Sequence, residues 1–315
     1  MLFNNFSIES IQQSINGKFD WGNRVTCQIS RNGDLVHKMY VEVELAKLYS
    51  GNIDNILTEN LDRYVNFIGH RLLKSVEVEI GGQKIDKHYS QWLDIYNELF
   101  ETSHDYRMMM STGSQVDAAT NTFTCYLPLR FWFNRNPGLA LPLIALQYHE
   151  VKVILNQQAE KVYTSGSVTN ELWVDYIYLD TDERRRFAQV SHEYLIEQVQ
   201  QQSLTNTATN EINFNHPVKE LIWSGDVAVD TGIRTDTITT ADKTWQLKLN
   251  GHDRFAARNT KYFTRSQVWQ YHTGVCGLSN VAGVGQIRDN IAVYSFALKP
   301  EEHQPSGTCN FSRID

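Results

Sequence analysis

Segments in which apolar and polar residues alternate with a period of two recur along this chain of 315 residues. From Met39 to Leu45 the odd-numbered residues are apolar, while Tyr40, Glu42 and Glu44 lie between them. Successive side chains of a β-strand point to opposite faces of its sheet, so each such segment has one face to bury and one to expose. The alternation therefore predicts an all-β protein made of antiparallel sheets.

Two dipeptides with strong turn preferences follow alternating segments. Asn32-Gly33 comes after the run that begins at Val25, and Gly81-Gly82 comes after the run that begins at Val76. Both central residues of a type I′ turn need a positive φ, which Asn and Gly tolerate, so each dipeptide predicts a β-hairpin. The expected strands are 25–29, 39–45, 76–80, 83–89, 123–129, 149–155 and 172–179, and further along 212–214, 218–223, 245–249 and 291–298.

Two short helices are expected among these strands. Ser90 can cap a helix over the segment QWLDIYNELF, in which Leu93, Tyr96 and Phe100 share one face. A second helix is expected to begin at Thr181, because acidic residues follow it in the first turn.

The organisation of the chain changes near residue 190, where strand signals stop. A polar linker without aromatic residues, SLTNTATNE, follows over 203–211, and strand signals then begin again. Long connections between short strands favour a jelly roll over a tight meander. We therefore expect one sandwich over residues 1–186 and a second over residues 187–315.

The charge balance argues against generic binding to nucleic acid. The chain has 29 basic and 36 acidic residues and a net charge of −7. The densest basic run, Arg184-Arg185-Arg186, follows Asp180, Asp182 and Glu183, so we interpret it as local neutralisation at a helix start. No secretory signal is visible, and no apolar stretch approaches the ~18 residues that a membrane span needs.

The four cysteines are Cys27, Cys125, Cys276 and Cys309. They lie far apart in the sequence and form no CxxC pair, and two of them occupy apolar positions of alternating segments. We interpret them as buried free thiols of a protein from a reducing compartment.

The sequence contains none of the usual motifs of catalysis or cofactor binding. Gly283 and Gly285 form only a GxG without a Walker lysine, and neither His149-Glu150 nor His192-Glu193 has the second histidine of HExxH. None of the ten histidines belongs to the HxH pair of metal-binding cupin jelly rolls. We therefore expect no catalytic residue, no cofactor and no metal site.

Two polar candidates have simpler structural interpretations. Asp175 lies in the expected strand 172–179, where its alternation partners are mixed, so we interpret it as an outward-facing residue and not a buried acid. Gly251-His252-Asp253-Arg254 combines an acid, a base and a cation, but adjacent residues seldom converge on one substrate. A polar turn after the strand 245–249 explains this cluster.

Aromatic residues gather at Phe131-Trp132-Phe133 and at Tyr262-Phe263. Such clusters serve either as packing anchors or as stacking platforms for sugars. The first cluster lies in a loop-like stretch before the apolar run 139–146, and large apolar side chains on a long loop favour burial against another subunit. The alternative is a lectin-like jelly roll that binds carbohydrate through Trp132.

Several long runs, in order along nearly the whole chain, resemble the major capsid protein of nucleocytoplasmic large DNA viruses, the group with mimivirus-like, phycodnavirus and iridovirus particles. The runs that carry the resemblance are Asn23 to Leu35, Tyr126 to Phe133, Leu179 to Arg185, Asn250 to Phe255, Tyr294 to Pro300 and Gln304 to Arg313.

The resemblance implies a double jelly roll of two antiparallel eight-stranded sandwiches with short helices in the loops. It also implies a structural capsid protein, not an enzyme, whose homotrimers form pseudo-hexagonal capsomers. These capsomers would tile an icosahedral shell, with minor capsid proteins as partners and an inner viral membrane beneath. We expect no sequence-specific contact with nucleic acid, and we expect assembly in the host cytoplasm.

The two ends of the chain differ from the family's pattern. Members usually begin upstream of the region that matches Asn5 to Ser10 and continue well past Ser312 to Asp315. The resemblance therefore predicts truncation at both ends and an incomplete second sandwich.

Overall fold

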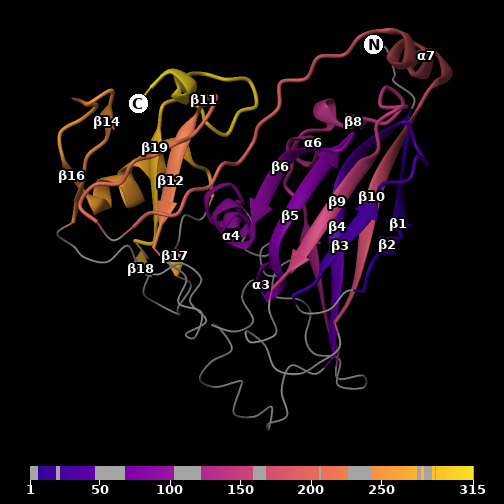
Figure 1. The fold of residues 1–315 in the computed structure, drawn as a ribbon, viewed down its shortest axis with the longest axis horizontal. Coiled ribbons are helices and arrows are strands. Elements are labelled where there is room, and N and C mark those ends of the chain that lie inside the picture. Colours follow the sequence, from indigo (N-terminus) through magenta and orange to yellow (C-terminus); the bar gives the residue numbers. More distant parts are fainter. Residues whose placement is uncertain are drawn as a thin grey trace. The chain divides into compact units, whose positions relative to one another are not determined.

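The computed structural model divides into two compact units, which we describe separately (Figure 1). The first comprises Met1–Leu93 and Asp105–Val199, and the second comprises Asp94–His104 and Gln200–Asp315. The sandwich boundary expected between residues 186 and 187 stays a prediction. The structure describes residues 6–18, 22–46, 68–102, 122–158, 168–205, 207–225, 243–274, 278–279, 286–287 and 289–314.

Two antiparallel sheets form the first unit. Sheet A has the strand order β1-β10-β4-β7, with the short β8 also paired to β4, and sheet B has the order β2-β3-β9-β5-β6. The strands are β1 (Phe6–Gln13), β2 (Ile15–Asn16), β3 (Arg24–Gln28), β4 (Leu35–Ala46), β5 (Leu73–Ile80), β6 (Gln83–Tyr89), β7 (Thr122–Pro128), β8 (Leu141–Pro142), β9 (Val151–Gln157) and β10 (Val168–Leu179).

The pairing of the longer strands defines a jelly roll. Without the two-residue strands β2 and β8, eight strands remain in this described unit. The first pairs with the eighth (β1 with β10), the second with the seventh (β3 with β9), the third with the sixth (β4 with β7) and the fourth with the fifth (β5 with β6). This nested antiparallel pairing is that of one long hairpin rolled into two sheets. The eight-stranded jelly roll expected for the first half is confirmed.

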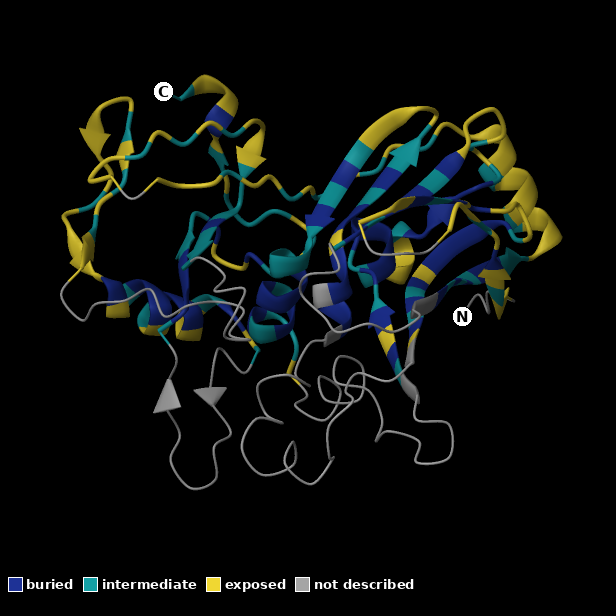
Figure 2. Cartoon of the chain, turned by 60° about the horizontal axis from the view of Figure 1, so that its bottom comes forward, coloured by how far each residue is buried: buried dark blue, intermediate teal, exposed yellow. Residues whose placement is uncertain are grey.

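The alternating residues of the strands fill the space between the two sheets. On β4, Val41 and Val43 are fully buried while Glu42 and Glu44 face outward, as the period of two predicts. Val25 on β3 and Val78 on β5 approach the same core from sheet B, and the strands carry alternating bands of burial (Figure 2). Each fully buried side chain of this size contributes about 1.5–3 kcal/mol.

The two glycine turns have different outcomes. The hairpin at Gly81-Gly82 is confirmed: it joins β5 to β6, and the two residues have φ values of 59° and 82°. The hairpin expected at Asn32-Gly33 is wrong, because β3 and β4 lie in different sheets. Gly33 has no positive φ; a Cβ there would lie 2.7 Å from the Cβ of Tyr176, so close packing requires the glycine.

Tyr176 connects this corner to both sheets. Its side chain is fully buried, and its hydroxyl lies 2.7 Å from the carbonyl oxygen of Ser30 and 3.1 Å from Oε1 of Gln13. The backbone N–H of Ser30 donates to the same Gln13 oxygen at 2.9 Å. The two buried side chains of the corner, Tyr176 and Gln13, therefore both have hydrogen-bond partners, as buried polar groups require.

Both expected helices are present. The first is α4 (Ser90–Leu99), and the Ser90 hydroxyl donates to the carbonyl oxygen of His70. The second is α7 (Thr181–Gln189), where Asp180 is the N-cap and accepts a hydrogen bond from the backbone of Thr181. Further helical segments in the described part of the first unit are α3 (Ile68–Leu72), α6 (Trp132–Arg135) and η1 (Pro137–Leu139), while α4 continues from Leu93 into the second unit.

The described strands of the second unit form antiparallel pairs. Its core is aromatic: Phe263 and Ala292 are fully buried and Trp223, Trp245 and Phe255 pack against them. The pairs are β11 (Pro217–Val218) with β20 (Cys309–Asn310), β12 (Glu220–Ser224) with β19 (Ile291–Ser295), β13 (Thr244–Trp245) with β16 (Arg258–Asn259), β14 (Lys248–Leu249) with β15 (His252–Asp253), and β17 (Leu278–Ser279) with β18 (Gln286–Ile287). Helical segments are η3 (Tyr262–Gln267), α8 (Val268–Tyr271) and η4 (Phe311–Arg313).

Three strands expected in the second half differ from the structure. The strand 218–223 is divided between β11, which pairs with β20, and β12, which pairs with β19. The strand 245–249 is divided between β13 and β14, which pair with different partners. The segment 212–214 forms no strand, because glutamine side chains take the place of a neighbouring strand. The backbone of Asn213 donates to Gln202, and the backbone of Asn215 exchanges two hydrogen bonds with Gln200.

The corner network leads to a stability prediction. Replacing Tyr176 by Phe removes the hydrogen bond from a fully buried side chain to the Ser30 carbonyl oxygen and lowers the free energy of unfolding by about 0.5–1.5 kcal/mol. The matched control is Tyr178→Phe, which removes an exposed hydroxyl bonded to Glu9 and changes stability by less than about 0.5 kcal/mol. Urea unfolding, with hydrogen exchange at β1 and β10, measures both. Equal midpoints for the two variants would contradict the assignment.

Candidate functional site

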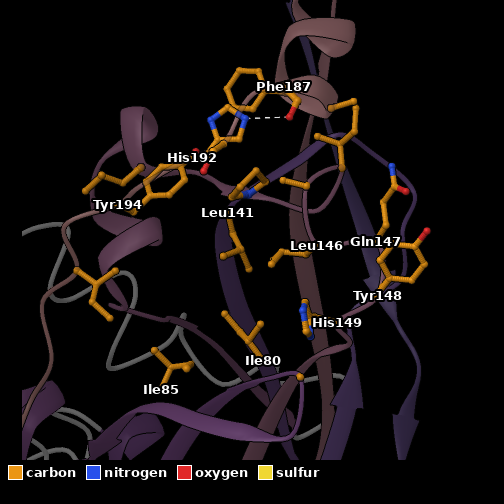
Figure 3. Close-up of a pocket in the computed structure, with 18 of the residues that line it drawn as sticks. Ile80, Ile85, Leu141, Leu146, Gln147, Tyr148, His149, Phe187, His192 and Tyr194 are labelled. Atoms are coloured by element: carbon orange, nitrogen blue, oxygen red, sulfur yellow. Dashed lines mark hydrogen bonds between the residues drawn. The ribbon is translucent and has the colours of Figure 1, made fainter.

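An open hollow of about 740 Å³ lies in the first unit, beside the β5–β6 turn (Figure 3). The loop that follows η1 and the segment after α7 form its other walls. Ile80, Ile85, Leu141 and Leu146 are among its apolar lining residues, and none of its described lining residues is Asp, Glu, Lys or Arg. The hollow can accept apolar side chains, but it lacks the paired acid and base that general acid–base catalysis uses.

The rim of the hollow exposes large apolar side chains. Tyr148 is 94% exposed, and Val190 and Ile196 are also exposed. His192 stacks on Phe187 at 4.7 Å, and its Nε2 lies 2.8 Å from the Phe187 carbonyl oxygen (Figure 3). These two contacts connect the end of α7 to the segment that follows it in the wall of the hollow. Exposed apolar groups gathered around a concave surface are typical of a contact with another protein.

The aromatic cluster Phe131-Trp132-Phe133 lies inside the first unit. All three side chains are buried at the start of α6, with Trp132 only 4% exposed. Phe131 stacks on His88 at 4.5 Å, and Trp132 meets Phe133 edge to face at 5.0 Å. The expectation that another subunit buries this cluster is therefore wrong, because the chain's own core does so.

Tyr262-Phe263 is also a packing element. Phe263 is fully buried and lies 5.2 Å from Trp223, and Tyr262 lies beneath the guanidinium of Arg258 at 4.2 Å and accepts a hydrogen bond from Gln267. The cluster stabilises the second unit.

The Gly251-His252-Asp253-Arg254 cluster is a polar turn, as expected. Asn250 and Gly251 have φ values of 50° and 75° and close the hairpin between β14 and β15. All four residues of the cluster are exposed, and Asp253 forms an ion pair with Lys248 at 3.6 Å. The side chains do not converge on one point, so the cluster has no catalytic geometry.

The other polar candidates are placed as follows. Asp175 lies at a β-bulge between β10 and β4 and is half-buried. His149 packs against Gly81 in the hollow, whereas Glu150 pairs with Lys152 at 2.9 Å. Gly283 and Gly285 lie outside the described residues.

The basic run at the start of α7 has partners in its own unit. Arg184 binds Asp34 through two contacts of 2.9 and 3.0 Å, and Arg185 lies 4.0 Å from Asp182. The interpretation as local neutralisation is supported by these contacts.

Three of the cysteines fall within the described residues. Cys27 and Cys125 are fully buried, and burial raises the pKa of each thiol to about 12. Cys309 is half-buried, and its pKa is also raised by burial. All three are free thiols, while Cys276 lies outside the described residues.

The structure assembles one ionisable group that the sequence did not reveal. The His272 side chain is completely buried in the second unit. Its Nε2 lies 3.1 Å from Glu220 and its Nδ1 lies 3.2 Å from Glu301, which also accepts two hydrogen bonds from Thr273. The Glu220 contact is an ion pair without hydrogen-bond alignment, so its attraction is electrostatic. Phe100 packs edge to face on the imidazole at 5.1 Å.

In the triad of His272, Glu220 and Glu301, the positive and negative charges attract one another. Burial disfavours a charged imidazole, but the two carboxylates outweigh burial and raise the pKa of His272 from 6.5 to about 9. Burial acts to raise the pKa of Glu301, but hydrogen bonds from His272 and Thr273 lower it overall. A buried imidazolium that holds its proton at neutral pH cannot act as a general base. Its role is to connect β12, α8 and the segment after β19.

Two findings concern metal binding and membrane-spanning helices. The part of the chain that the structure describes has no group of three His, Cys, Asp or Glu side chains placed to hold a metal ion. Among its described helices, none has the length and apolar character to cross a membrane.

Comparison with solved structures defines the class of protein. The chain matches "PBCV-1 virus capsid, quasi-atomic model" with a TM-score of 0.82 and 38% identity, over 100% of this chain and 83% of that one. The Faustovirus major capsid protein has the same fold, with a TM-score of 0.74 at 14% identity, over 99% of this chain and 86% of that one. The fold is the double jelly roll of viral capsid proteins, which confirms the predicted fold class.

Comparison of sequences defines the family. Residues 2–180 match the model "Major capsid protein N-terminus", and residues 183–315 match "Large eukaryotic DNA virus major capsid protein". The major capsid protein of Pyramimonas orientalis virus is 50% identical over 99% of this chain and 82% of its own length, and that of Paramecium bursaria Chlorella virus 1 is 42% identical over 99% and 78%. The chain belongs to the major capsid protein family of large eukaryotic DNA viruses, and the predicted relationship is confirmed.

The His272 triad predicts a pH dependence of stability. Because the folded pKa lies above the unfolded value of 6.5, the stabilisation is complete below about pH 6.5 and is lost as the pH rises through about 9. The steepest loss is about 1.4 kcal/mol per pH unit. Thermal unfolding measured across this range should show the loss in the wild type and a flatter profile in His272→Gln. The exposed His252→Gln variant is the control, and an equally steep profile for His272→Gln would contradict the role of the triad.

Proposed function

We propose that this chain is a shell subunit whose homotrimers form pseudo-hexagonal capsomers that tile the icosahedral shell of a large DNA virus. The observation that carries the proposal is the match to the PBCV-1 capsid over the whole chain, at a TM-score of 0.82 and 38% identity. A chain with two jelly rolls supports the same geometry, since three copies supply six sandwiches to an approximately six-fold outline. Closed symmetry of this kind repeats one interface around a ring.

Surface chemistry supports a role in packing. The hollow of the first unit has an apolar lining and an exposed apolar rim. No acid–base pair suited to catalysis is found among its described lining residues. The relatives are structural capsid proteins. We therefore propose a structural role without enzymatic activity, cofactor or metal.

The lectin-like alternative loses its main support. A sugar platform needs an exposed ring, whereas Trp132 is buried in the core of the first unit. Replacing Trp132 would damage that core, so it cannot test sugar binding. The self-packing function accounts for the buried cluster and the exposed hollow together.

The wider setting of the subunit is part of the proposal. We expect it in the virion, with minor capsid proteins and an inner membrane as neighbours and assembly in the host cytoplasm. The net charge of −7 agrees with the absence of sequence-specific binding to nucleic acid.

The assembly state tests this function directly. Size-exclusion chromatography with light scattering should give a species with three times the chain mass of 36.3 kDa. Dilution should not dissociate it at micromolar concentration, because a capsomer must survive until it reaches the shell. A folded protein that stays monomeric at high concentration would refute the proposal.

A further inference from the structure

The outer face of sheet A carries a row of aromatic side chains across three neighbouring strands. Trp173 on β10 and Tyr40 on β4 are register partners, and their rings are almost parallel, with centroids 6.3 Å apart and an interplanar angle of 8°. Tyr126 on β7 meets Tyr40 edge to face at 5.9 Å and is 39% exposed. The faces of such rings attract cations.

Carboxylates surround the aromatic row. Glu42 on β4 lies directly opposite Glu171 on β10, and the hydroxyl of Tyr126 donates to Glu42 at 3.4 Å. Like charges opposite each other on adjacent strands destabilise a sheet, and a cation held between them removes that cost. Glu44 and Asp175 extend the same face, where Lys38 is the single basic residue among the described strand positions. The chemistry of this acidic face fits a cationic partner.

A hairpin of the second unit has the opposite character. Residues 243–261 contain five basic residues and one acidic residue, in a chain whose net charge is −7. All five are exposed, and Figure 2 shows exposed segments along this part of the chain. They are Lys243, Lys248, Arg254, Arg258 and Lys261.

The basic hairpin is held in a defined shape. Its strand pairs are β13 with β16 and β14 with β15, and the backbone of Arg254 donates to Leu247 between them. Trp245 donates to the Thr260 hydroxyl at 2.9 Å, and that hydroxyl donates to the Lys243 carbonyl oxygen at 3.0 Å. The basic side chains are therefore presented by an ordered element, which lowers the entropy cost of binding.

We propose that copies of this chain join head to tail, with the basic hairpin of one copy bound to the acidic face of sheet A in the next. Charge complementarity identifies a second copy as the partner, because every chain carries both surfaces. Such a heterologous contact generates a ring that closes when the rotation fits. Arg and Lys side chains on Trp and Tyr rings are the kind of contact that dominates interface energies. This inference rests on the proposed function, since it assigns the interface of the proposed trimer.

Charge reversal tests the interface. The acidic-face variant is Glu42→Lys with Glu171→Lys, and the hairpin variant is Lys248→Glu with Arg254→Glu. Each should weaken trimer formation at least about tenfold through like-charge contact, and a chain with all four changes should recover it. The control reverses the exposed Lys74 and Lys84 on sheet B and should remain trimeric.

The outcomes separate this inference from the function it rests on. A monomeric wild type refutes the proposed function. If the wild type is trimeric and the two charge-reversal variants are equally trimeric, only this interface is overturned. The same conclusion holds if the chain with all four substitutions stays dissociated. A hairpin variant that remains trimeric but loses binding to phosphatidylserine vesicles or duplex DNA would assign the hairpin to an anionic partner instead.

Cross-linking provides a test that does not depend on charge. In a chain with both Glu42→Cys and Lys248→Cys, oxidation should yield chains linked to one another on a non-reducing gel, while a chain with either substitution alone gives the background. A bridge formed only within one chain, or no bridge at all, would overturn the inference.

Discussion

The nested pairing of eight antiparallel strands is the constraint on which the first unit depends. Because β1 pairs with β10 and β3 with β9, strands from the two ends of the unit must meet before either sheet is complete. Each sheet then buries one face, and its outer face and connecting loops remain for other contacts. The Tyr176 network fixes the corner where the chain passes between the sheets. A protein built this way offers rigid surfaces, which is what a shell subunit needs.

The described part of the second unit is stabilised by different interactions. Its strand pairs are short, and the contacts among them come from an aromatic core around Phe263 and from the buried His272 triad. Electrostatics takes two forms in the described residues. Buried charges connect elements within the second unit, whereas half-buried carboxylates on the outer face of sheet A and exposed basic side chains on the hairpin have opposite signs. This second set suits recognition between copies, since charge complementarity favours a specific partner and orientation.

Sequence reasoning predicted local features better than distant ones. The Gly81-Gly82 hairpin was predictable because the turn and its strands are contiguous, yet Asn32-Gly33 carries a similar signal and lies at a corner between sheets. Asn250-Gly251 has the same turn preference, and it does close a hairpin, between β14 and β15. The loop-like sequence around Trp132 predicts a subunit contact, but a position in a loop does not reveal which core covers the side chain. His272 meets the carboxylates of Glu220 and Glu301 only through tertiary packing, so no residue spacing in the sequence could predict this triad.

A cryo-electron microscopy map of the purified oligomer would test the central claim most directly. The account predicts three copies related by a three-fold axis, with six jelly rolls in an approximately hexagonal ring and one type of contact repeated around it. A two-fold dimer joined through identical surfaces, or a ring with a different number of copies, would contradict it.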